Sequence, residues 1–205
     1  MNHPKTPIQG FPTRYAELQP QEDKDHPWTA AAARVYKALK KGGLIALYGN
    51  RGTGKTYMAR DMANRCENYP DPWFPQKYAD GTPINARPAI YSTAMMIFLQ
   101  IRNTYRNDCP TSELDLMESW KDAALLVIDE IQERGESTFE DQKLAAIIDM
   151  RYQHNRPTIL IANYATSREF AAAVSPSIAS RMQENGGSIL CDWPSFRATP
   201  HQNPA

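Results

Sequence analysis

The sequence predicts an α/β fold in which helices cover both faces of a parallel sheet, giving three layers. Short apolar runs alternate along the chain with longer stretches of helical periodicity, and this alternation is typical of parallel sheets. The run at residues 123–128 is apolar without a polar alternation, as expected of a strand that is buried on both faces. A glycine-rich turn at residues 49–56 joins an apolar run to a helical stretch. These three observations favour one sheet with a ligand site beside that turn.

The elements can be assigned in order along the chain. We expect strands at residues 44–48, 89–91, 123–128, 158–162 and 188–191. We expect helices at residues 29–41, from 55 to about 67, at 93–107, at 111–122, from Ser137 onward and from Ser175 onward. Ser137 and Glu140 form a capping box, Ser175-Pro176 supplies an N-cap with a first-turn proline, and Gly186-Gly187 is predicted to end the last helix.

The domain organisation follows from length and composition. A chain of 205 residues is the size of one domain. We expect a flexible N-terminal arm at residues 1–26, a core at 27–198 whose first segment begins at about residue 10, and a disordered tail at 199–205. The proline- and aromatic-rich connection at residues 68–88 is interpreted as an elaborated surface loop, with a functional loop as the alternative.

The overall composition excludes several classes of protein. Lysine plus arginine and aspartate plus glutamate both number 23, so net charge indicates neither a nucleic-acid nor a membrane partner. Cys66, Cys109 and Cys191 lack C-x-x-C spacing, which argues against a metal site and for a reducing compartment. No run approaches the ~18 apolar residues of a membrane span. We therefore expect a soluble, cytoplasmic protein with no membrane partner.

The turn at residues 49–56 matches the pattern G-x-x-x-x-G-K-T of a phosphate-binding loop, or P-loop. Its glycines allow backbone N–H groups to approach phosphate oxygens, and the following helix adds its positive end. Lys55 would reach the β- and γ-phosphates, and the Thr56 hydroxyl would ligate Mg²⁺. ATP and Mg²⁺ are the expected ligands. The predicted nucleotide contacts are Gly49, Asn50, Arg51, Gly52, Thr53, Gly54, Lys55, Thr56 and Tyr57.

Two further strands end in polar residues. Asp129 and Glu130 follow the strand at 123–128, and Asn163 follows the strand at 158–162. Ligands of parallel sheets bind at the carboxyl ends of the strands. Asp129 would therefore help hold Mg²⁺, and Glu130 would polarise the attacking water. Asn163 could orient that water or only cap its strand, and the residues alone leave both possibilities open.

Two arginines are ambiguous from the residues alone. Arg181 belongs to the helix opened by Ser175, and Arg197 follows Trp193-Pro194-Ser195-Phe196. Either can be a solvated surface residue. The functional alternative is an arginine finger that enters the nucleotide site of a neighbouring subunit and accelerates hydrolysis by about 10³–10⁵.

Taken together, the motifs resemble AAA+ ATPases of the DnaC/DnaI helicase-loader group, and the related IstB-like transposition ATPases share most of them. The resemblance rests on the P-loop, residues 125–130, Arg156-Pro157-Thr158 with Asn163, Ser180-Arg181-Met182 and the Trp193–Arg197 ending, with residues 11–15 as a core-start segment. It implies an AAA+ P-loop NTPase fold without a C-terminal lid domain. It also implies Walker B roles for Asp129 and Glu130, a sensor role for Asn163, a finger role for Arg181 and a second-sensor role for Arg197.

The resemblance also implies a DNA contact. The helix at 93–107 corresponds to the insertion that lines single-stranded DNA in assembled loaders. Arg102, Tyr105 and Arg106 suit that task because arginines hold phosphates and aromatic rings stack on bases. From the residues alone they are an ordinary exposed helix face.

The predicted function is that of an ATP-dependent DNA replication protein resembling a helicase loader. It would form an ATP-dependent oligomer, hydrolyse ATP slowly until assembled, and bind single-stranded DNA and a hexameric, DnaB-type helicase. Only about 25 residues precede the core, so we expect the helicase contact to use the short arm, residues 70–88 or another subunit. One alternative is an IstB-like regulator of transposition on duplex DNA. Another is an ATP-bound adaptor that recruits or inhibits a host replication protein.

Overall fold

The computed structural model describes residues 10–13, 24–68, 88–133 and 137–197. Most of the predicted arm, nearly all of the 68–88 connection and the predicted tail lie outside the described residues. The helices are α1 (Pro27–Leu39), α2 (Lys55–Asn68), α3 (Ala94–Asn103), α4 (Glu113–Asp122), α5 (Thr138–Gln153), α6 (Ser167–Ala173) and α7 (Pro176–Glu184), with a 3₁₀ turn at Ile131–Glu133. The strands are β1 (Leu44–Tyr48), β2 (Ile90–Thr93), β3 (Leu126–Asp129), β4 (Thr158–Ala162) and β5 (Gly186–Leu190).

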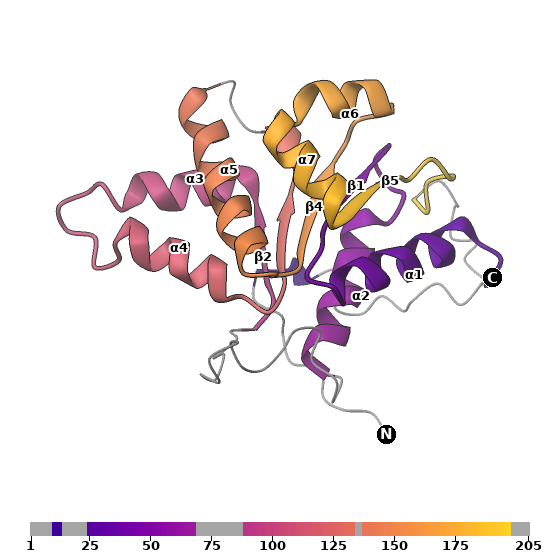
Figure 1. Cartoon of the computed structure of the whole chain (residues 1–205), viewed down its shortest axis with the longest axis horizontal. Coiled ribbons are helices and arrows are strands. Elements are labelled where there is room, and N and C mark those ends of the chain that lie inside the picture. Colours follow the sequence, from indigo (N-terminus) through magenta and orange to yellow (C-terminus); the bar gives the residue numbers. More distant parts are fainter. Residues whose placement is uncertain (1–9, 14–23, 69–87, 134–136, 198–205) are drawn as a thin grey trace, which may run out of the picture.

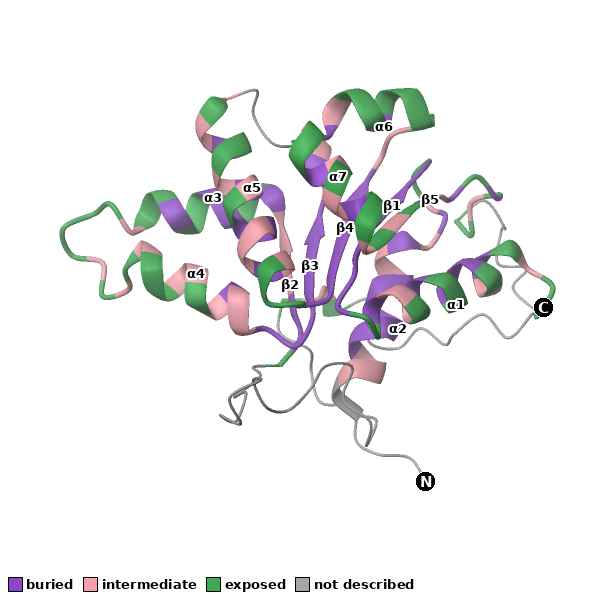
Figure 2. Cartoon of the chain, in the orientation of Figure 1, coloured by how far each residue is buried: buried purple, intermediate pink, exposed green. Residues whose placement is uncertain are grey.

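The five strands form one parallel sheet in the order β2-β3-β4-β1-β5 (Figure 1). Alternate residues of each strand face opposite sides. Ile45 and Leu47 of β1 pack in a core with α1 and α2, whereas Leu44, Ala46 and Tyr48 pack in a second core with α3, α4, α5 and α7. Purple runs along β1, β3 and β4 in Figure 2 because both faces of these strands are covered, whereas the edge strands β2 and β5 are partly exposed. The predicted three-layer α/β fold is confirmed.

Local capping signals explain several element boundaries. Ser137 accepts a hydrogen bond from the Glu140 N–H at the start of α5, and Ser175 accepts one from the Ile178 N–H at the start of α7. Both N-caps were predicted. The helix predicted at 93–107 is shorter than expected, because Thr93 is its N-cap and Asn103 its last residue. Helix α6 was not predicted, since its seven residues are too few to show a helical period.

The prediction for Gly186-Gly187 was wrong. These glycines do not end α7 but begin β5, and Asn185 is the C-cap of the helix. A Cβ atom on Gly186 would lie 1.8 Å from the Leu44 carbonyl oxygen of β1. The glycine is therefore required by the close approach of two strands rather than by a helix end.

Arg151 links helix α4 to the amino-terminal ends of strands β3 and β4. Its side chain is completely buried, and it donates to the carbonyls of Lys121 (3.1 Å), Ala123 (3.1 Å) and Pro157 (2.6 Å). Burial lowers the pKa of this guanidinium to about 9, which still leaves it charged at neutral pH. Neutral oxygens, not an acidic partner, thus tie the end of α4 to the starts of β3 and β4.

None of the described helices combines the length and the apolar character that crossing a membrane requires. No helical domain follows β5 within the described residues, which end at Arg197.

Candidate nucleotide-binding site

The P-loop lies between β1 and α2, at the carboxyl ends of the strands. Its glycines adopt conformations that favour glycine, with φ of +87° at Gly52 and +79° at Gly54. A Cβ on Gly52 would lie 2.0 Å from the Ser195 hydroxyl oxygen. A side chain at Gly52 would therefore be strained and would clash, so the fold of this loop requires glycine there.

Lys55 is buried against the loop that it follows. Its ammonium donates to the carbonyl oxygens of Gly49 (2.8 Å) and Asn50 (2.7 Å). Burial lowers the pKa of Lys55, with Asp129 and Cys191 acting in the opposite direction. A partly desolvated cation of this kind gains from a bound anion, so the loop geometry suits a triphosphate.

The P-loop and the end of β3 meet through one hydrogen bond. The Thr56 hydroxyl donates to Asp129 Oδ2 at 2.8 Å, and the Tyr91 hydroxyl donates to the same oxygen at 2.9 Å. The other carboxylate oxygen accepts the Glu130 N–H at 2.7 Å. Thr56 and Asp129 thus present two oxygens side by side, which fits a hard cation such as Mg²⁺. The described residues contain no cluster of three or more acidic, histidine or cysteine ligands, and Mg²⁺ commonly takes few protein ligands plus phosphate oxygens.

Glu130 has a left-handed backbone conformation, with φ of +55°. Such a conformation is uncommon for a residue with a side chain, and strained residues of this kind cluster at active sites and ligand clamps. Its carbonyl accepts the Glu133 N–H at 2.9 Å, which closes the 3₁₀ turn. The strand therefore turns sharply at Glu130, just after the carboxylate of Asp129.

Asn163 lies at the end of β4, where it was predicted. Its backbone N–H donates to the side-chain oxygen of Gln132 at 3.0 Å. Gln132 belongs to the 3₁₀ turn that follows β3. This bond joins the ends of β3 and β4 and holds Asn163 beside the acidic pair.

The segment after β5 folds back over the P-loop. The Trp193 indole donates to the Thr53 carbonyl at 2.8 Å, and the Phe196 N–H donates to the Gly52 carbonyl at 3.0 Å. Arg197 follows, with its Cδ 3.6 Å from the position that a Cβ on Gly52 would take. Its charge is one of the influences that lower the pKa of Lys55. The structure thus brings Arg197 to the P-loop, although the two lie far apart in sequence.

Arg181 lies elsewhere. Its guanidinium forms an ion pair with Asp149 of α5 and sits over the Tyr152 ring, 5.5 Å from the ring centroid. It also donates to the Ser177 carbonyl of its own helix at 2.8 Å. Within one chain, the Arg181 side chain thus lies between α5 and α7.

The three predicted DNA contacts lie on and just after α3 and are paired with carboxylates. Arg102 bonds to Glu140 at 2.8 Å, the Tyr105 hydroxyl donates to Glu113 at 2.8 Å, and Arg106 lies 3.4 Å from Asp108. All three side chains remain largely exposed. A nucleic acid would have to compete with those carboxylates.

Sequence reasoning missed Tyr91 and Gln132. Tyr91 lies on β2, and the register that pairs Thr93 with Asp129 carries its hydroxyl to the carboxylate. Neither residue belongs to a motif. Only the order of the strands, with β2 beside β3, could have drawn attention to Tyr91.

Comparisons with known proteins identify the family and the fold. The family model described as "ATPase family associated with various cellular activities (AAA)" matches residues 45–185. The replicative helicase loader DnaC of Escherichia coli (strain K12) is 26% identical over 151 residues, which are 73% of this chain and 54% of that protein. The chain therefore spans about half the length of this relative.

Solved structures show the same fold. A crystal structure of the DnaC helicase loader has a TM-score of 0.62 with 14% identity, covering 86% of this chain and 94% of that one. A crystal structure of DnaI gives a TM-score of 0.60 with 16% identity, covering 91% and 94%. Domain III of the Thermotoga maritima replication initiation protein DnaA gives 0.60 with 16% identity, covering 89% and 68%. With the sequence match to DnaC, these similarities support the predicted DnaC/DnaI-like group.

Proposed function

Because this chain belongs to the AAA family of ATPases, we propose that it binds ATP with Mg²⁺ and hydrolyses it at a site shared by two copies of the chain. The observation that carries the proposal is the 2.8 Å hydrogen bond between Thr56 and Asp129. This bond places the P-loop next to the acidic end of β3, and a phosphoryl-transfer site needs both parts.

Each residue has a role that follows from its place. Lys55 holds the β- and γ-phosphates, and Thr56 with Asp129 holds Mg²⁺, which neutralises charge that develops on the phosphates. Glu130, which lies at the sharp turn after β3, accepts the proton of the attacking water. Asn163 orients that water, and Arg197 contacts the phosphates from the C-terminal segment. The shared C-terminal ends of β1, β3 and β4 support these assignments.

The proposed site also needs a finger for the γ-phosphate, and we assign that role to Arg181 of a second copy. Arg181 is bound to Asp149 on its own chain, so its proposed role requires an exchange of partners when a second copy docks. Hydrolysis should therefore be slow in isolated chains and rise with assembly. We place this activity in the cytoplasm.

The biological role we propose is in DNA replication. The named relatives are a replicative helicase loader and replication initiators, and these names support loading or regulation of a hexameric helicase. Arg102, Tyr105 and Arg106 would contact single-stranded DNA after leaving their carboxylate partners. A charge swap at Arg102 and Arg106 should weaken single-strand binding and reduce its salt dependence, whereas Arg168→Glu on the exposed part of α6 should do neither.

The enzymatic proposal is tested by separating binding from turnover. Glu130→Gln should keep ATP binding, measured with a fluorescent ATP analogue, and lose phosphate release by at least about 100-fold. Lys55→Ala should lose binding itself. Glu118→Gln, at an exposed position of α4, is the matched control. Unchanged turnover in Glu130→Gln rules out its role as base.

Two alternatives predict other results. A transposition regulator would prefer duplex to single-stranded DNA. An ATP-bound adaptor would retain partner capture in Glu130→Gln and show no stimulation of turnover by assembly. A pull-down of a replicative helicase with ATP present distinguishes the loader from the transposition regulator.

A further inference from the structure

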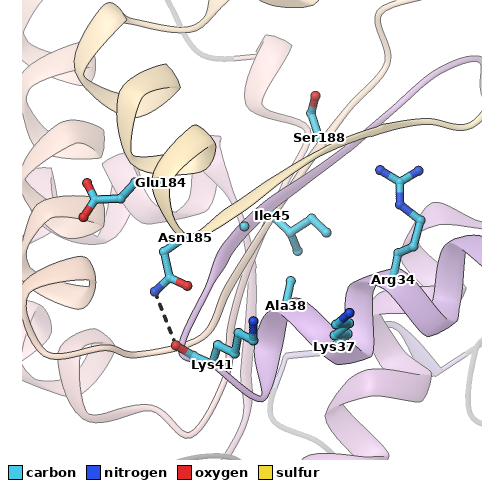
Figure 3. A pocket seen from close by; sticks show the side chains of 9 residues that line it. Arg34, Lys37, Ala38, Lys41, Ile45, Glu184, Asn185 and Ser188 are labelled. Atoms are coloured by element: carbon cyan, nitrogen blue, oxygen red, sulfur yellow. Dashed lines mark hydrogen bonds between the residues drawn. The ribbon is translucent and has the colours of Figure 1, made fainter.

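A pocket of about 360 Å³ lies between α1 and the edge strand β5 (Figure 3). It is far from the P-loop along the strands, because Gly186 pairs with Leu44 at the start of β1 whereas the P-loop follows the end of β1. Arg34, Lys37 and Lys41 line one side, and Gly186 and Ser188 of β5 line the other. Nothing in the proposed ATPase cycle uses this pocket.

The pocket is strongly cationic. Arg34 and Lys37 lie one turn apart on α1. Lys41 lies four residues further along, just after the helix, and all three side chains are exposed. Across the described parts of the chain, none of the three forms an ion pair with an acid. The one acid of the lining, Glu184, bonds to the Tyr152 hydroxyl, and its carboxylate points away from the cations in Figure 3. Three like charges at this spacing repel one another, and an anionic ligand would relieve that repulsion.

The other wall offers unpaired backbone. Within the described sheet β5 has a strand neighbour on one side only. The Leu44 N–H donates to the Asn185 carbonyl (2.8 Å), and the Cys191 N–H donates to the Tyr48 carbonyl (2.7 Å). In a parallel pair, alternate residues of a strand hydrogen-bond to one neighbouring strand, and these two bonds show which residues of β5 bond to β1. Residues 187 and 189 therefore face β1, and the N–H and C=O groups of Gly186, Ser188 and Leu190 face outward.

The described residues leave that edge accessible. Gly186 and Ser188, whose backbone groups face outward, are both exposed. Gly186 also has no side chain that could cover the edge. An exposed strand edge with these properties is a template for an added strand.

We propose that this pocket binds an acidic segment of another protein in an extended conformation, which pairs with the outer edge of β5 and places its carboxylates against Arg34, Lys37 and Lys41. Alternate residues of a strand lie on one side and are about 6.6 Å apart, so two or three acidic residues in alternation can reach the three cations. A nucleic acid would use the cations but not the strand edge, and the combination therefore favours a peptide.

The test uses a fluorescein-labelled peptide of eight residues in which glutamate and valine alternate, with the matching glutamine–valine peptide as comparison. Binding is followed by fluorescence anisotropy on the full chain without ATP. The glutamate peptide should bind and the glutamine peptide should bind at least about tenfold more weakly. The double variant Lys37→Ala/Lys41→Ala should lose about tenfold in affinity, equivalent to about 1.4 kcal/mol. Lys40→Ala, at a lysine placed over the Tyr36 ring, should lose none.

The backbone contribution is tested at Ser188. Ser188→Pro removes an outward N–H while sparing the ladder to β1, and edge strands tolerate proline at such positions. It should lose peptide binding with little change in thermal unfolding, whereas Ser188→Ala, which keeps the N–H, should bind as the unaltered chain does. Full binding by the lysine double variant overturns the proposal. A second result would also overturn it: the lysine double variant loses peptide binding while a folded Ser188→Pro keeps it. That pattern would indicate a simple anion site that makes no use of the strand edge.

Two other occupants give distinct results. The labelled peptide can be competed with a 20-nucleotide single strand, a 20-base-pair duplex or unlabelled peptide. If either nucleic acid displaces it at a lower concentration than the unlabelled peptide does, the pocket is a nucleic-acid site. A change in oligomeric state of Lys37→Ala/Lys41→Ala, measured by sedimentation, would assign it to a second copy of the chain. Either outcome overturns the peptide assignment.

Discussion

The hydroxyl of Tyr91 donates a 2.9 Å hydrogen bond to Asp129 Oδ2, the oxygen that also accepts the Thr56 hydroxyl. Tyr91 is held in turn by Phe11, whose ring centroid lies 4.6 Å away. The first described segment of the chain is therefore connected through one aromatic contact to the proposed Mg²⁺ ligand.

Tyr91→Phe should raise the Mg²⁺ concentration needed for half-maximal ATPase activity, because the carboxylate loses a partner that fixes its orientation. Loss of such an outer partner typically weakens metal binding by about 10- to 100-fold. A Mg²⁺ titration of phosphate release measures this effect. Tyr164→Phe, which lies against Phe170, is the control, and equal titration curves for Tyr91→Phe and the unaltered chain would contradict the assignment.

Asp149→Asn should lower the protein concentration at which ATPase activity is half-maximal. The ion pair with Asp149 keeps Arg181 on its own chain, and a partly exposed pair contributes about 0.2–1 kcal/mol. Removing it should shift the midpoint by about 1.4- to fivefold without changing activity at saturating protein. Asp122→Asn, which removes a carboxylate paired with Lys121, should leave the midpoint in place. A midpoint that moves upward in Asp149→Asn would show that the pair supports assembly instead.

Glu113 provides a pH-dependent contribution to stability. Its carboxylate accepts from Lys143 and Tyr105, and the hydrogen bond from Lys143 is the main cause that lowers its pKa below the ordinary 4.5. Because the folded pKa is the lower one, this stabilisation is complete above about pH 4.5 and is lost as the pH falls through the folded pKa. Glu113→Gln should therefore be less stable than the unaltered chain at pH 7, by at most about 1 kcal/mol, and the difference should be smaller at pH 3.

Urea unfolding at the two pH values measures that difference. Glu118→Gln, one helical turn away and exposed, should show no pH-dependent change. A difference of the same size at both pH values would mean that the carboxylate charge plays no part.

Arg151→Met should destabilise the fold by at least about 3 kcal/mol, because several buried carbonyl oxygens lose their donor at once. Urea unfolding measures the loss, and Arg168→Met on an exposed position of α6 is the control. A loss below about 1 kcal/mol would show that water or rearranged backbone can replace the guanidinium.

The sequence was sufficient for the sheet and the P-loop because these depend on local patterns. The runs that became β1 and β4 were predicted with their exact bounds, and the Ser137 and Ser175 caps lie where hydrogen bonding demands them. Gly186 was misread because a glycine after a helix fits a C-cap as well as a close strand contact. Tyr91 and Gln132 were missed because their roles depend on the order and register of strands, which no local pattern encodes.

The finger role of Arg181 was predicted from resemblance alone, and the structure adds that its guanidinium is held by Asp149 and Tyr152 within one chain. The proposed finger role therefore requires Arg181 to leave these contacts when a second copy docks. Arg197 differs, since the backbone bond from Phe196 to Gly52 brings it to the P-loop of its own chain.

The shared site is tested most directly by mixing two inactive variants. Arg181→Ala keeps an intact P-loop but has no finger, and Lys55→Ala keeps the finger but cannot hold ATP. Each alone should release phosphate at a small fraction of the normal rate, and an equimolar mixture should recover activity, because Arg181 of the second variant completes the site of the first. A mixture that stays as inactive as its two components would contradict an ATP site built from two copies of this chain.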